Sequence, residues 1–208
     1  PGNAGAELIE IAENVELKGI QEYIDFAKKN GIDLTIVGSE ELLVQGIVDE
    51  LKKNGLKIFG PDKKAAVLEG SKAYSKDFMK KYGIKTAVYE IFDNFEKAKE
   101  FLNSWKDFPV VIKASGLAAG KGVIIAQNLD EAVKAVEDIM VDEKFGNAGN
   151  QVVIEEYLDG VEASILSFTD SNVILPLLSA KDHKKIGENE TGLNTGGMGA
   201  ISPNPYVT

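Results

Sequence analysis

The sequence has no cysteine and only one histidine in 208 residues. A chain without cysteine forms no disulfides and has no thiol nucleophile, and a single histidine cannot build a zinc site of the usual kind. No apolar run approaches the roughly 20 residues that a membrane-spanning helix needs, and no signal peptide is recognisable. These absences indicate a soluble, cytoplasmic protein.

Positive charge is also scarce. Lysine and arginine together number 23 against 33 acidic residues, which gives a formal net charge of −10. The net field repels phosphate, so neither nucleic acid nor an anionic membrane is an expected partner, and any anionic ligand must be held by local donors. The apolar fraction of 44% is enough for a real core and excludes a wholly disordered chain.

Residues 1–61 alternate between helical and strand-like periodicity. Apolar residues favour helices over 20–30 and 42–51 and short strands over 32–38 and 56–59, the first strand being buried. Helix, strand, helix, strand at this spacing predicts a parallel sheet. Two strands alone cannot close a doubly wound core.

Residues 62–82 predict two helices with a break at Gly70-Ser71, where Ser71 suits an N-cap. Beyond them strands and helices alternate, followed by two strands spaced as antiparallel neighbours. From Lys181 onward the sequence becomes polar and glycine-rich. The later predicted strands are 86–92, 109–114, 122–126, 151–157, 161–169 and 173–179, and the later predicted helices are 94–104 and 130–140.

The segment from Lys113 to Gly122, KASGLAAGKG, joins two predicted strands as a long hairpin loop of small residues. Glycine and alanine let backbone N–H groups approach a ligand closely, and lysines bracket the loop, a combination that suits a polyphosphate. It differs from a P-loop, because Gly122 stands where Ser or Thr should follow Lys121 and a strand follows instead of a helix. The alternative interpretation is a flexible hairpin without a ligand.

Other segments carry candidate chemistry, and each also has a purely structural interpretation. Carboxylates gather in EEYLDGVE (155–162), which alone is better explained as a solvated strand end. The only histidine lies in DHKK (182–185), and a lone histidine is more often a surface or hydrogen-bonded structural residue. Ordering the glycine-rich NTGGMGA (194–200) costs much conformational entropy. Such a segment is therefore expected only where a ligand or a close backbone contact requires it. EGSKAYSK (69–76) alone is typical of an exposed helix start with solvated lysines.

Taken together and in this order, these segments resemble the ATP-grasp ligases, and most closely the phosphoribosylamine–glycine ligase (glycinamide ribonucleotide synthetase) family. The resemblance covers essentially the whole chain and is most specific in PGNAG (1–5), GLAAGKGV (116–123) and NTGGMGA. It implies a fold that is α/β and α+β. The implied parts are the latter part of a Rossmann-like (pre-ATP-grasp) substrate domain at 1–61, a helical linker at 62–85, the small ATP-grasp lobe with a glycine-rich lid at 86–157, and the start of a truncated large lobe at 158–208.

The resemblance also implies an ATP site. Lys72 and Lys113 would be the catalytic cations that reach the phosphates, and the loop after Lys113 would close over them as a lid. The segment that starts at Glu155 would pair with adenine through backbone groups and a carboxylate, and Glu162 would bind the ribose hydroxyls. The implied ATP-binding residues are Lys72, Lys113, Ser115, Gly116, Leu117, Ala118, Ala119, Gly120, Lys121, Gly122, Glu155, Glu156, Tyr157, Leu158 and Glu162.

Substrate-binding residues follow from the same resemblance. PGNAG is similar to the family's loop near the phosphate of phosphoribosylamine, and the segments around residues 182–184 and 194–198 would face glycine and phosphoribosylamine. The implied substrate-binding residues are Gly2, Asn3, Ala4, Gly5, Asp182, His183, Lys184, Asn194, Thr195, Gly196, Gly197 and Met198.

The chemistry that the resemblance implies has two steps. The glycine carboxylate attacks the γ-phosphate of ATP to give glycyl phosphate, and the amine of 5-phosphoribosylamine then attacks that acyl phosphate. The products are glycinamide ribonucleotide, ADP and phosphate, as in purine biosynthesis. ATP and Mg²⁺ (or Mn²⁺) are the implied cofactors, with the metal ligands expected C-terminal to this chain and none within it. The alternatives are another ATP-grasp carboxylate–amine ligase and a nucleotide-binding module without turnover.

Some positions depart from the family's pattern. Ser115 stands where the family commonly has Asp, Leu193 where it has Pro, and Lys185 where it has Arg, which removes a bidentate phosphate contact but keeps the charge. The strand and glycine-rich turn that precede PGNAG in the family are missing, as is everything after Thr208. We therefore expect a fragment of such a ligase that is inactive by itself.

Overall fold

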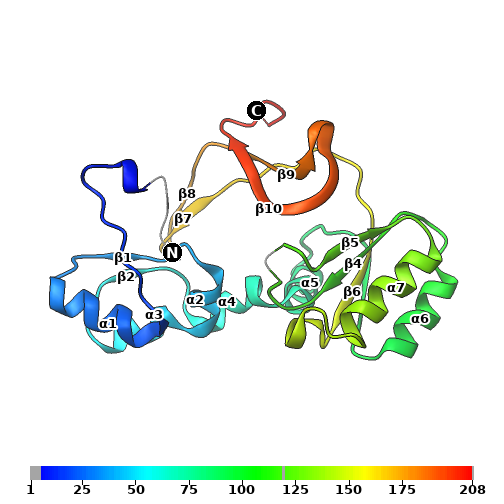
Figure 1. Cartoon of the computed structure of the whole chain (residues 1–208), viewed down its shortest axis with the longest axis horizontal. Coiled ribbons are helices and arrows are strands. Elements are labelled where there is room, and N and C mark those ends of the chain that lie inside the picture. The colour runs from blue at the N-terminus through cyan, green and yellow to red at the C-terminus, as the bar shows by residue number, and fades with distance from the viewer. Residues whose placement is uncertain (1–5, 119, 208) are drawn as a thin grey trace. The chain divides into compact units, whose positions relative to one another are not determined.

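The computed structural model describes residues 6–118 and 120–207 (Figure 1). The chain divides into two compact units, Pro1–Gly70 and Ser71–Thr208, which are described separately below. This division falls at the predicted break between two helices. The finer predicted boundaries, after residues 61, 85 and 157, stay predictions.

The first unit contains short helices and a two-stranded parallel sheet, as the periodicity predicts. Helix α1 ends at Gly31, whose φ of 62° is left-handed. The helix predicted over 42–51 is two helices, because Gly46 adopts a φ of 97° and divides them. The elements are η1 (Ala6–Leu8), α1 (Gly19–Asn30), β1 (Thr35–Ile36), α2 (Glu40–Gln45), α3 (Ile47–Lys53), β2 (Ile58–Phe59) and α4 (Lys63–Gly70).

The prediction that 32–38 forms a buried strand is wrong in its extent and its burial. Only Thr35–Ile36 pairs with β2, and the side chains of Leu34 and Ile36 are 53% and 67% exposed. The core of this unit lies instead between α1 and α3, around Ile24 and Leu51. Within the described residues β1 has a single neighbouring strand, so its apolar side chains lack a covering layer.

The second unit is built on a four-stranded antiparallel sheet with the strand order β3-β6-β4-β5. The hairpin predicted on either side of the glycine-rich loop is confirmed as β4 and β5. The elements up to the sheet's last strand are α5 (Lys72–Lys81), β3 (Tyr89–Phe92), α6 (Phe95–Ser104), β4 (Val110–Ala114), β5 (Val123–Ala126), α7 (Leu129–Met140), η2 (Gly146–Gly149) and β6 (Val152–Glu156).

The two faces of this sheet differ in what covers them. Ile112 and Ile154 point to the face on which α6 and α7 pack, and this face forms the main core of the unit (Figure 1). Because side chains alternate along a strand, the neighbouring residues point the other way. We call this second side the α5 face; it carries Tyr89, Val111, Lys113, Val123, Ile125, Val153 and Glu155.

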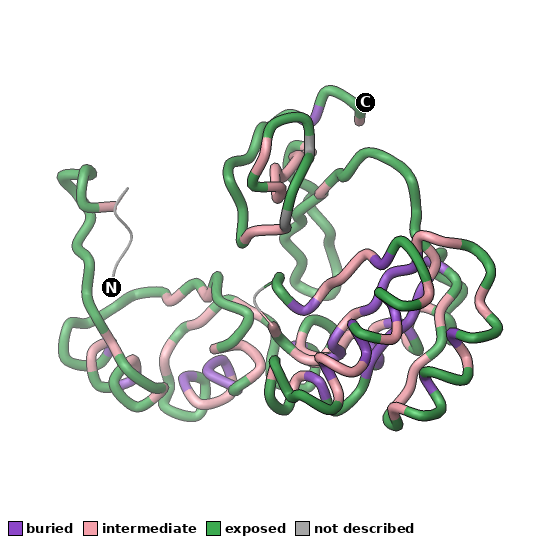
Figure 2. Tube along the Cα trace, turned by 45° about the vertical axis from the view of Figure 1, so that its right-hand side comes forward, coloured by how far each residue is buried: buried purple, intermediate pink, exposed green. Residues whose placement is uncertain are grey.

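The rest of the second unit consists of two hairpins with little burial. The antiparallel pair predicted for 161–169 and 173–179 is confirmed, although only β7 (Ser167–Thr169) and β8 (Ile174–Pro176) are paired. The polar segment that follows was not predicted as regular structure, yet it forms the long hairpin of β9 (Lys181–Gly187), η3 (Glu188–Glu190) and β10 (Thr191–Ile201). Figure 2 shows these hairpins mostly exposed, in contrast to the buried strands of the four-stranded sheet. In the described part of the chain no helix has the length and apolar character to cross a membrane.

Candidate functional site

The base of the glycine-rich loop is anchored to the body of the sheet. The N–H of Ser115 donates to the Gln151 carbonyl at 2.9 Å, and that of Gly116 donates to the Ala148 carbonyl at 3.0 Å. A Cβ on Gly116 would lie 2.7 Å from the Cα of Ala148, so only glycine allows this approach. The predicted lid therefore has a fixed base at its first two residues, and its tip begins at Leu117.

Ser115 also caps helix α5. Its carbonyl accepts from the N–H of Lys72 at 2.7 Å, and its hydroxyl accepts from the N–H of Ala73 at 3.1 Å. The predicted N-cap, Ser71, is confirmed, because its hydroxyl accepts from the N–H of Tyr74 at 3.2 Å. The first N–H groups of α5 are thus already paired within the protein. An anion near this helix end would have to be held by side chains.

Lys72 extends from the first turn of α5 toward the loop. Its Nζ donates to the carbonyl oxygen of Gly116 at 2.9 Å. This contact places one ammonium group at the base of the glycine-rich loop, where the resemblance expects a phosphate-binding cation.

A buried ion cluster lies on the α5 face. The carboxylate of Glu155, with a side chain only 6% exposed, contacts the ammonium of Lys113 through one oxygen and that of Lys76 through the other, the latter at 2.5 Å. The Lys76 ammonium also donates to the Thr86 hydroxyl at 2.7 Å. Two cations share one anion, so the cluster carries a net charge of +1. Lys113 is its most exposed member, at 26% against 10% for Lys76.

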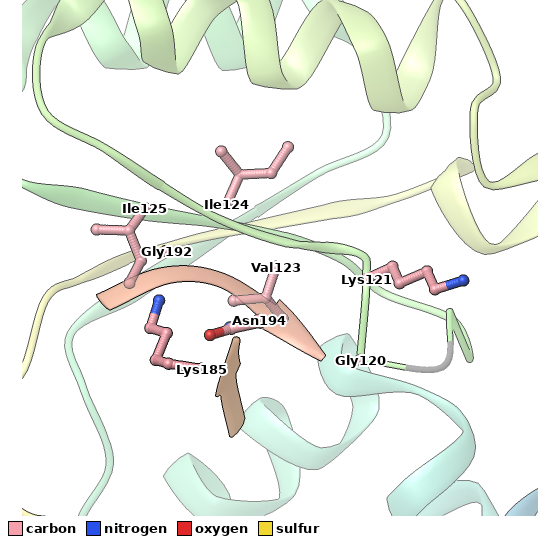
Figure 3. Close-up of a pocket in the computed structure, with 8 residues that line it drawn as sticks. All are labelled: Gly120, Lys121, Val123, Ile124, Ile125, Lys185, Gly192 and Asn194. Carbon is pink, nitrogen blue, oxygen red and sulfur yellow. The ribbon is translucent and has the colours of Figure 1, made fainter. Parts of the chain in front are cut away.

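A cavity of about 470 Å³ lies between β5 and the β9–β10 hairpin (Figure 3). Figure 3 shows the side chains of Lys185 and Asn194 directed toward Val123 and Ile125, while Lys121 extends to the other side. Val123 is the cross-strand partner of Lys113, so the cavity borders the ion cluster along the same face of the sheet. Its lining consists of Gly120, Lys121, Val123, Ile124, Ile125, Lys185, Gly192 and Asn194.

The carboxylates predicted to meet adenine and ribose have different surroundings. The Glu156 carboxylate accepts from the N–H of Val88 at 2.9 Å, which ties the end of β6 to the start of β3. Tyr157 and Leu158, which follow, are 42% and 64% exposed. Glu162 lies beyond them and pairs with Lys184 at 2.5 Å.

A buried asparagine holds the backbone at Glu162. Asn204 is 2% exposed, and its Nδ2 donates to the carbonyl oxygens of Glu162 at 3.0 Å and of Ala180 at 3.2 Å. Its Oδ1 accepts from the N–H of Tyr206 at 2.9 Å. These contacts connect the segment after β10 to the Glu162–Lys184 pair.

The two predicted substrate-binding segments meet in the β9–β10 hairpin. His183 is paired with Gly199, and the register shifts between Asn194 and Gly199. Thr195 stabilises this irregular part, because its hydroxyl donates to the Lys184 carbonyl at 2.8 Å. Gly197, with a φ of 127°, passes close to Asp182. The predicted segments around 182–184 and 194–198 are therefore neighbours, which their separation in the sequence does not reveal.

Some predicted residues lie outside the described part of the chain, namely Gly2, Asn3, Ala4, Gly5 and Ala119. Conversely, Lys76, Thr86 and the cavity residue Gly192 were not predicted to belong to the site, and Lys185 was noted only as a departure from the family's pattern. The sequence does indicate Lys76, because it lies four residues after Lys72 and so on the same face of a helix. It does not indicate Thr86, since its contact depends on how α5 lies on the sheet.

Within residues 6–118 and 120–207 no three side chains of His, Asp or Glu gather into a group that could hold a metal ion.

Two family descriptions match the chain end to end. "Phosphoribosylglycinamide synthetase, N domain" matches residues 1–69 and "Phosphoribosylglycinamide synthetase, ATP-grasp (A) domain" matches residues 70–208. The boundary between them agrees with the division into two compact units to within one residue.

Curated relatives agree with these matches. A phosphoribosylamine–glycine ligase of Fusobacterium nucleatum is 62% identical over 207 residues, which are 100% of this chain and 48% of the relative. That of Clostridium acetobutylicum is 57% identical over 100% of this chain and 50% of its own. The chain thus spans about half the length of the curated relatives it matches.

Solved structures with the same arrangement include a phosphoribosylamine–glycine ligase of Thermotoga maritima. It has a TM-score of 0.76 at 36% identity, over 96% of this chain and 47% of its own. A biotin carboxylase of Campylobacter jejuni has a TM-score of 0.68 at 20% identity, over 80% of this chain and 38% of its own, which shows likeness of fold alone.

Proposed function

Because the chain belongs to the phosphoribosylglycinamide synthetase family, we propose that it carries the nucleotide-binding part of an ATP-dependent ligase. The ligase would join glycine to 5-phosphoribosylamine through glycyl phosphate and release glycinamide ribonucleotide, ADP and phosphate. Half-length coverage of the relatives supports a further proposal, that turnover needs segments beyond the half that this chain matches.

One observation carries this proposal: lysine side chains gather around the glycine-rich loop in a protein with a net charge of −10. Lys72 reaches the base of the loop, Lys113 borders the cavity, and Lys121 and Lys185 line it. A triphosphate is the class of ligand that suits such a cluster. The lysines attract its negative charge locally, although the net charge of the chain repels it. The apolar side chains of Val123 and Ile125 offer a surface for the flat, weakly polar adenine ring.

The residues of this chain act mainly by binding and orientation. Lys72 and Lys113 neutralise charge on the transferred γ-phosphoryl group, where little covalent chemistry falls to the protein. The tip of the loop covers the phosphates and excludes water from the acyl phosphate, which water would otherwise hydrolyse. The carboxylate of glycine and the amine of phosphoribosylamine meet near the β9–β10 hairpin, where Lys184 and Asn194 supply polar contacts.

Magnesium is the metal that ATP-dependent phosphoryl transfer usually employs. Among the described residues no group of three carboxylate or histidine side chains gathers, whereas Mg²⁺ bound to a nucleotide usually takes one or two carboxylates besides the phosphates. We assign no step of the reaction to a metal held by these residues.

Calorimetric titration of the chain with ATP tests the nucleotide site. We expect saturable binding that weakens about tenfold or more when Lys113 is replaced by Ala, because a phosphate contact to a charged group is lost. Glu162→Ala tests the ribose contact and should weaken ATP and adenosine equally. Unchanged affinity in both variants would show that the site lies elsewhere.

An assay of ADP release with glycine and 5-phosphoribosylamine tests the turnover claim separately. No release above background is expected from the 208-residue chain. Sustained release by this chain would contradict the proposal that turnover needs further segments, while leaving the nucleotide site intact.

A further inference from the structure

The two lysines that contact Glu155 are held in different ways. The ammonium of Lys76 contacts three groups: the Glu155 carboxylate at 2.5 Å, the Thr86 hydroxyl at 2.7 Å and the face of the Tyr89 ring, 5.4 Å from its centroid. Lys113 contacts Glu155 from β4, is more exposed, and lies where the strand enters the glycine-rich loop. Lys76 is therefore the fixed partner, and Lys113 is the one positioned to turn toward a ligand.

The movement of Lys113 has an electrostatic consequence for Glu155. When an ammonium leaves a buried carboxylate, the anion is left uncompensated at a site that water does not reach, which is strongly unfavourable. With Lys76 present, Glu155 keeps one cation and the cluster can release the other. Without Lys76, Lys113 would be the only countercharge of Glu155. The net charge of the cluster would then be zero instead of +1.

We propose that Lys76 is a positioning residue that neutralises Glu155 and thereby makes the charge of Lys113 available to the phosphates of a bound nucleotide. This inference rests on the proposed ATP binding and extends it to a residue that itself touches no phosphate. It explains why a helix-borne lysine is buried beneath the nucleotide side of the sheet rather than left in solvent, where lysine is ordinarily found.

A series of nucleotides with different charge tests the inference. We expect Lys76→Met to weaken ATP binding by about 10- to 50-fold at low ionic strength, ADP binding by less, and adenosine binding hardly at all. The loss should follow phosphate charge, because the variant removes cationic charge and leaves the apolar surface intact. A purely structural role would weaken all three ligands alike, and that result would overturn the inference.

Two variants separate charge from packing. Lys76→Arg keeps the cation at the Glu155 carboxylate, and we expect it to restore ATP affinity to within about threefold of the unmodified chain. Lys81→Met removes the same charge from the same helix at an exposed position, where the ammonium lies over the Tyr82 ring, and should leave ATP affinity unchanged. An equal loss in Lys81→Met would mean that general charge, and not the contact with Glu155, is responsible.

A second measurement requires no ligand. Urea unfolding of Lys76→Met, Lys113→Met and the double variant forms a double-mutant cycle. If either lysine alone can neutralise Glu155, the double variant should raise the unfolding equilibrium constant about tenfold or more beyond the product of the single effects. If the double variant instead changes the unfolding equilibrium constant by the product of the two single effects, the inference is overturned.

The two measurements also distinguish this inference from the proposed function. If the unmodified chain fails to bind ATP, the proposed nucleotide site is wrong, whatever the cycle shows. If ATP binds but the affinity loss in Lys76→Met is independent of phosphate charge, the proposed function stands and the role of Lys76 falls.

Discussion

Two carboxylates of the second unit contact lysines in opposite surroundings. The side chain of Glu155, on β6, is 6% exposed and shared by Lys76 and Lys113, whereas that of Glu162 is 42% exposed and pairs with Lys184 alone. β6 lies inside the four-stranded sheet and is covered on both faces, while Glu162 lies in the exposed loop between β6 and β7. Both contacts join a glutamate carboxylate to lysine ammonium groups, so the two sites differ in burial and in the number of lysines.

Burial changes how much the loss of one partner of such an ion pair destabilises the protein. A buried carboxylate depends on its partners, because loss of one leaves an uncompensated charge in a medium of low polarity. An exposed carboxylate exchanges its lysine for water at little cost. Burial therefore fixes Glu155 and Lys76 in place beside the more exposed Lys113, whereas Glu162 and Lys184 can exchange partners at little cost.

The comparison predicts its largest difference for removal of the carboxylates themselves. Glu155→Ala leaves the buried ammonium of Lys76 and the partly exposed ammonium of Lys113 without their carboxylate, and we expect it to cost about 3–5 kcal/mol in the free energy of unfolding. Glu162→Ala should cost about 1 kcal/mol or less. The fluorescence of Trp105, the only tryptophan, follows urea unfolding of this unit, since its ring lies 5.5 Å from that of Phe101. Equal losses in the two variants would show that burial is not the deciding factor.

The second largest loss in the free energy of unfolding is expected for a neutral buried group, the hydroxyl of Ser115. Ser115→Ala removes the hydroxyl that accepts from the Ala73 N–H at the start of α5, and we expect a loss of about 0.5–2 kcal/mol, as for other helix caps. Ser167→Ala, at an exposed position on β7, is the matched control and should change the free energy of unfolding little. The same urea titration measures both, and a cost at Ser167 equal to that at Ser115 would contradict the structure.

Removal of one methylene group compares the buried sheet with the exposed hairpin without changing any charge or hydrogen bond. Ile154→Val removes a methylene from the buried sheet core and should cost about 0.5–1.5 kcal/mol. Ile174→Val makes the same change on β8, where the side chain is 71% exposed, and should cost almost nothing. If the two variants differ by less than the error of the measurement, the hairpin is better covered in solution than the structure indicates.

The smallest effect is expected at the surface of α7. Hydrogen bonds from Lys144 and Lys134 lower the pKa of Asp138 below its ordinary value. Because the folded-state pKa is the lower one, the stabilisation is present above the unfolded pKa of about 4 and is lost as pH falls through the folded value. Acid titration of stability should therefore show a shallower loss below pH of about 4 in Lys144→Met, and identical acid profiles would contradict this assignment.

The sequence predicts best where apolar runs and caps act locally. The apolar runs of β4 and β6 predict strands, and Ser71 marks a helix start through its own side chain. The order and spacing of the glycine-rich segments identify the family before any contact is known. The strands and the helix cap depend on a few consecutive residues, and the family resemblance depends on short motifs in a fixed order.

Features that depend on distant contacts escape the sequence. The hairpin β9–β10 has no apolar alternation, and its pairing comes from backbone hydrogen bonds and from contacts such as that of Thr195 with the Lys184 carbonyl. The exposure of β1 depends on which neighbours cover it, and the helix division at Gly46 on one left-handed residue. The role of Lys76 needs the register between a helix and a sheet, which no local pattern contains.

The central claim is that nucleotide binds on the α5 face of the sheet, against β5. Methyl NMR spectra of the chain, recorded as ATP is added, test it most directly. The account predicts shifts in the methyl signals of Val123 and Ile125, with Ile112 and Ile154 on the opposite face unaffected. Saturable shifts confined to Ile112, Ile154 or the first unit, or no shifts at all, would contradict it.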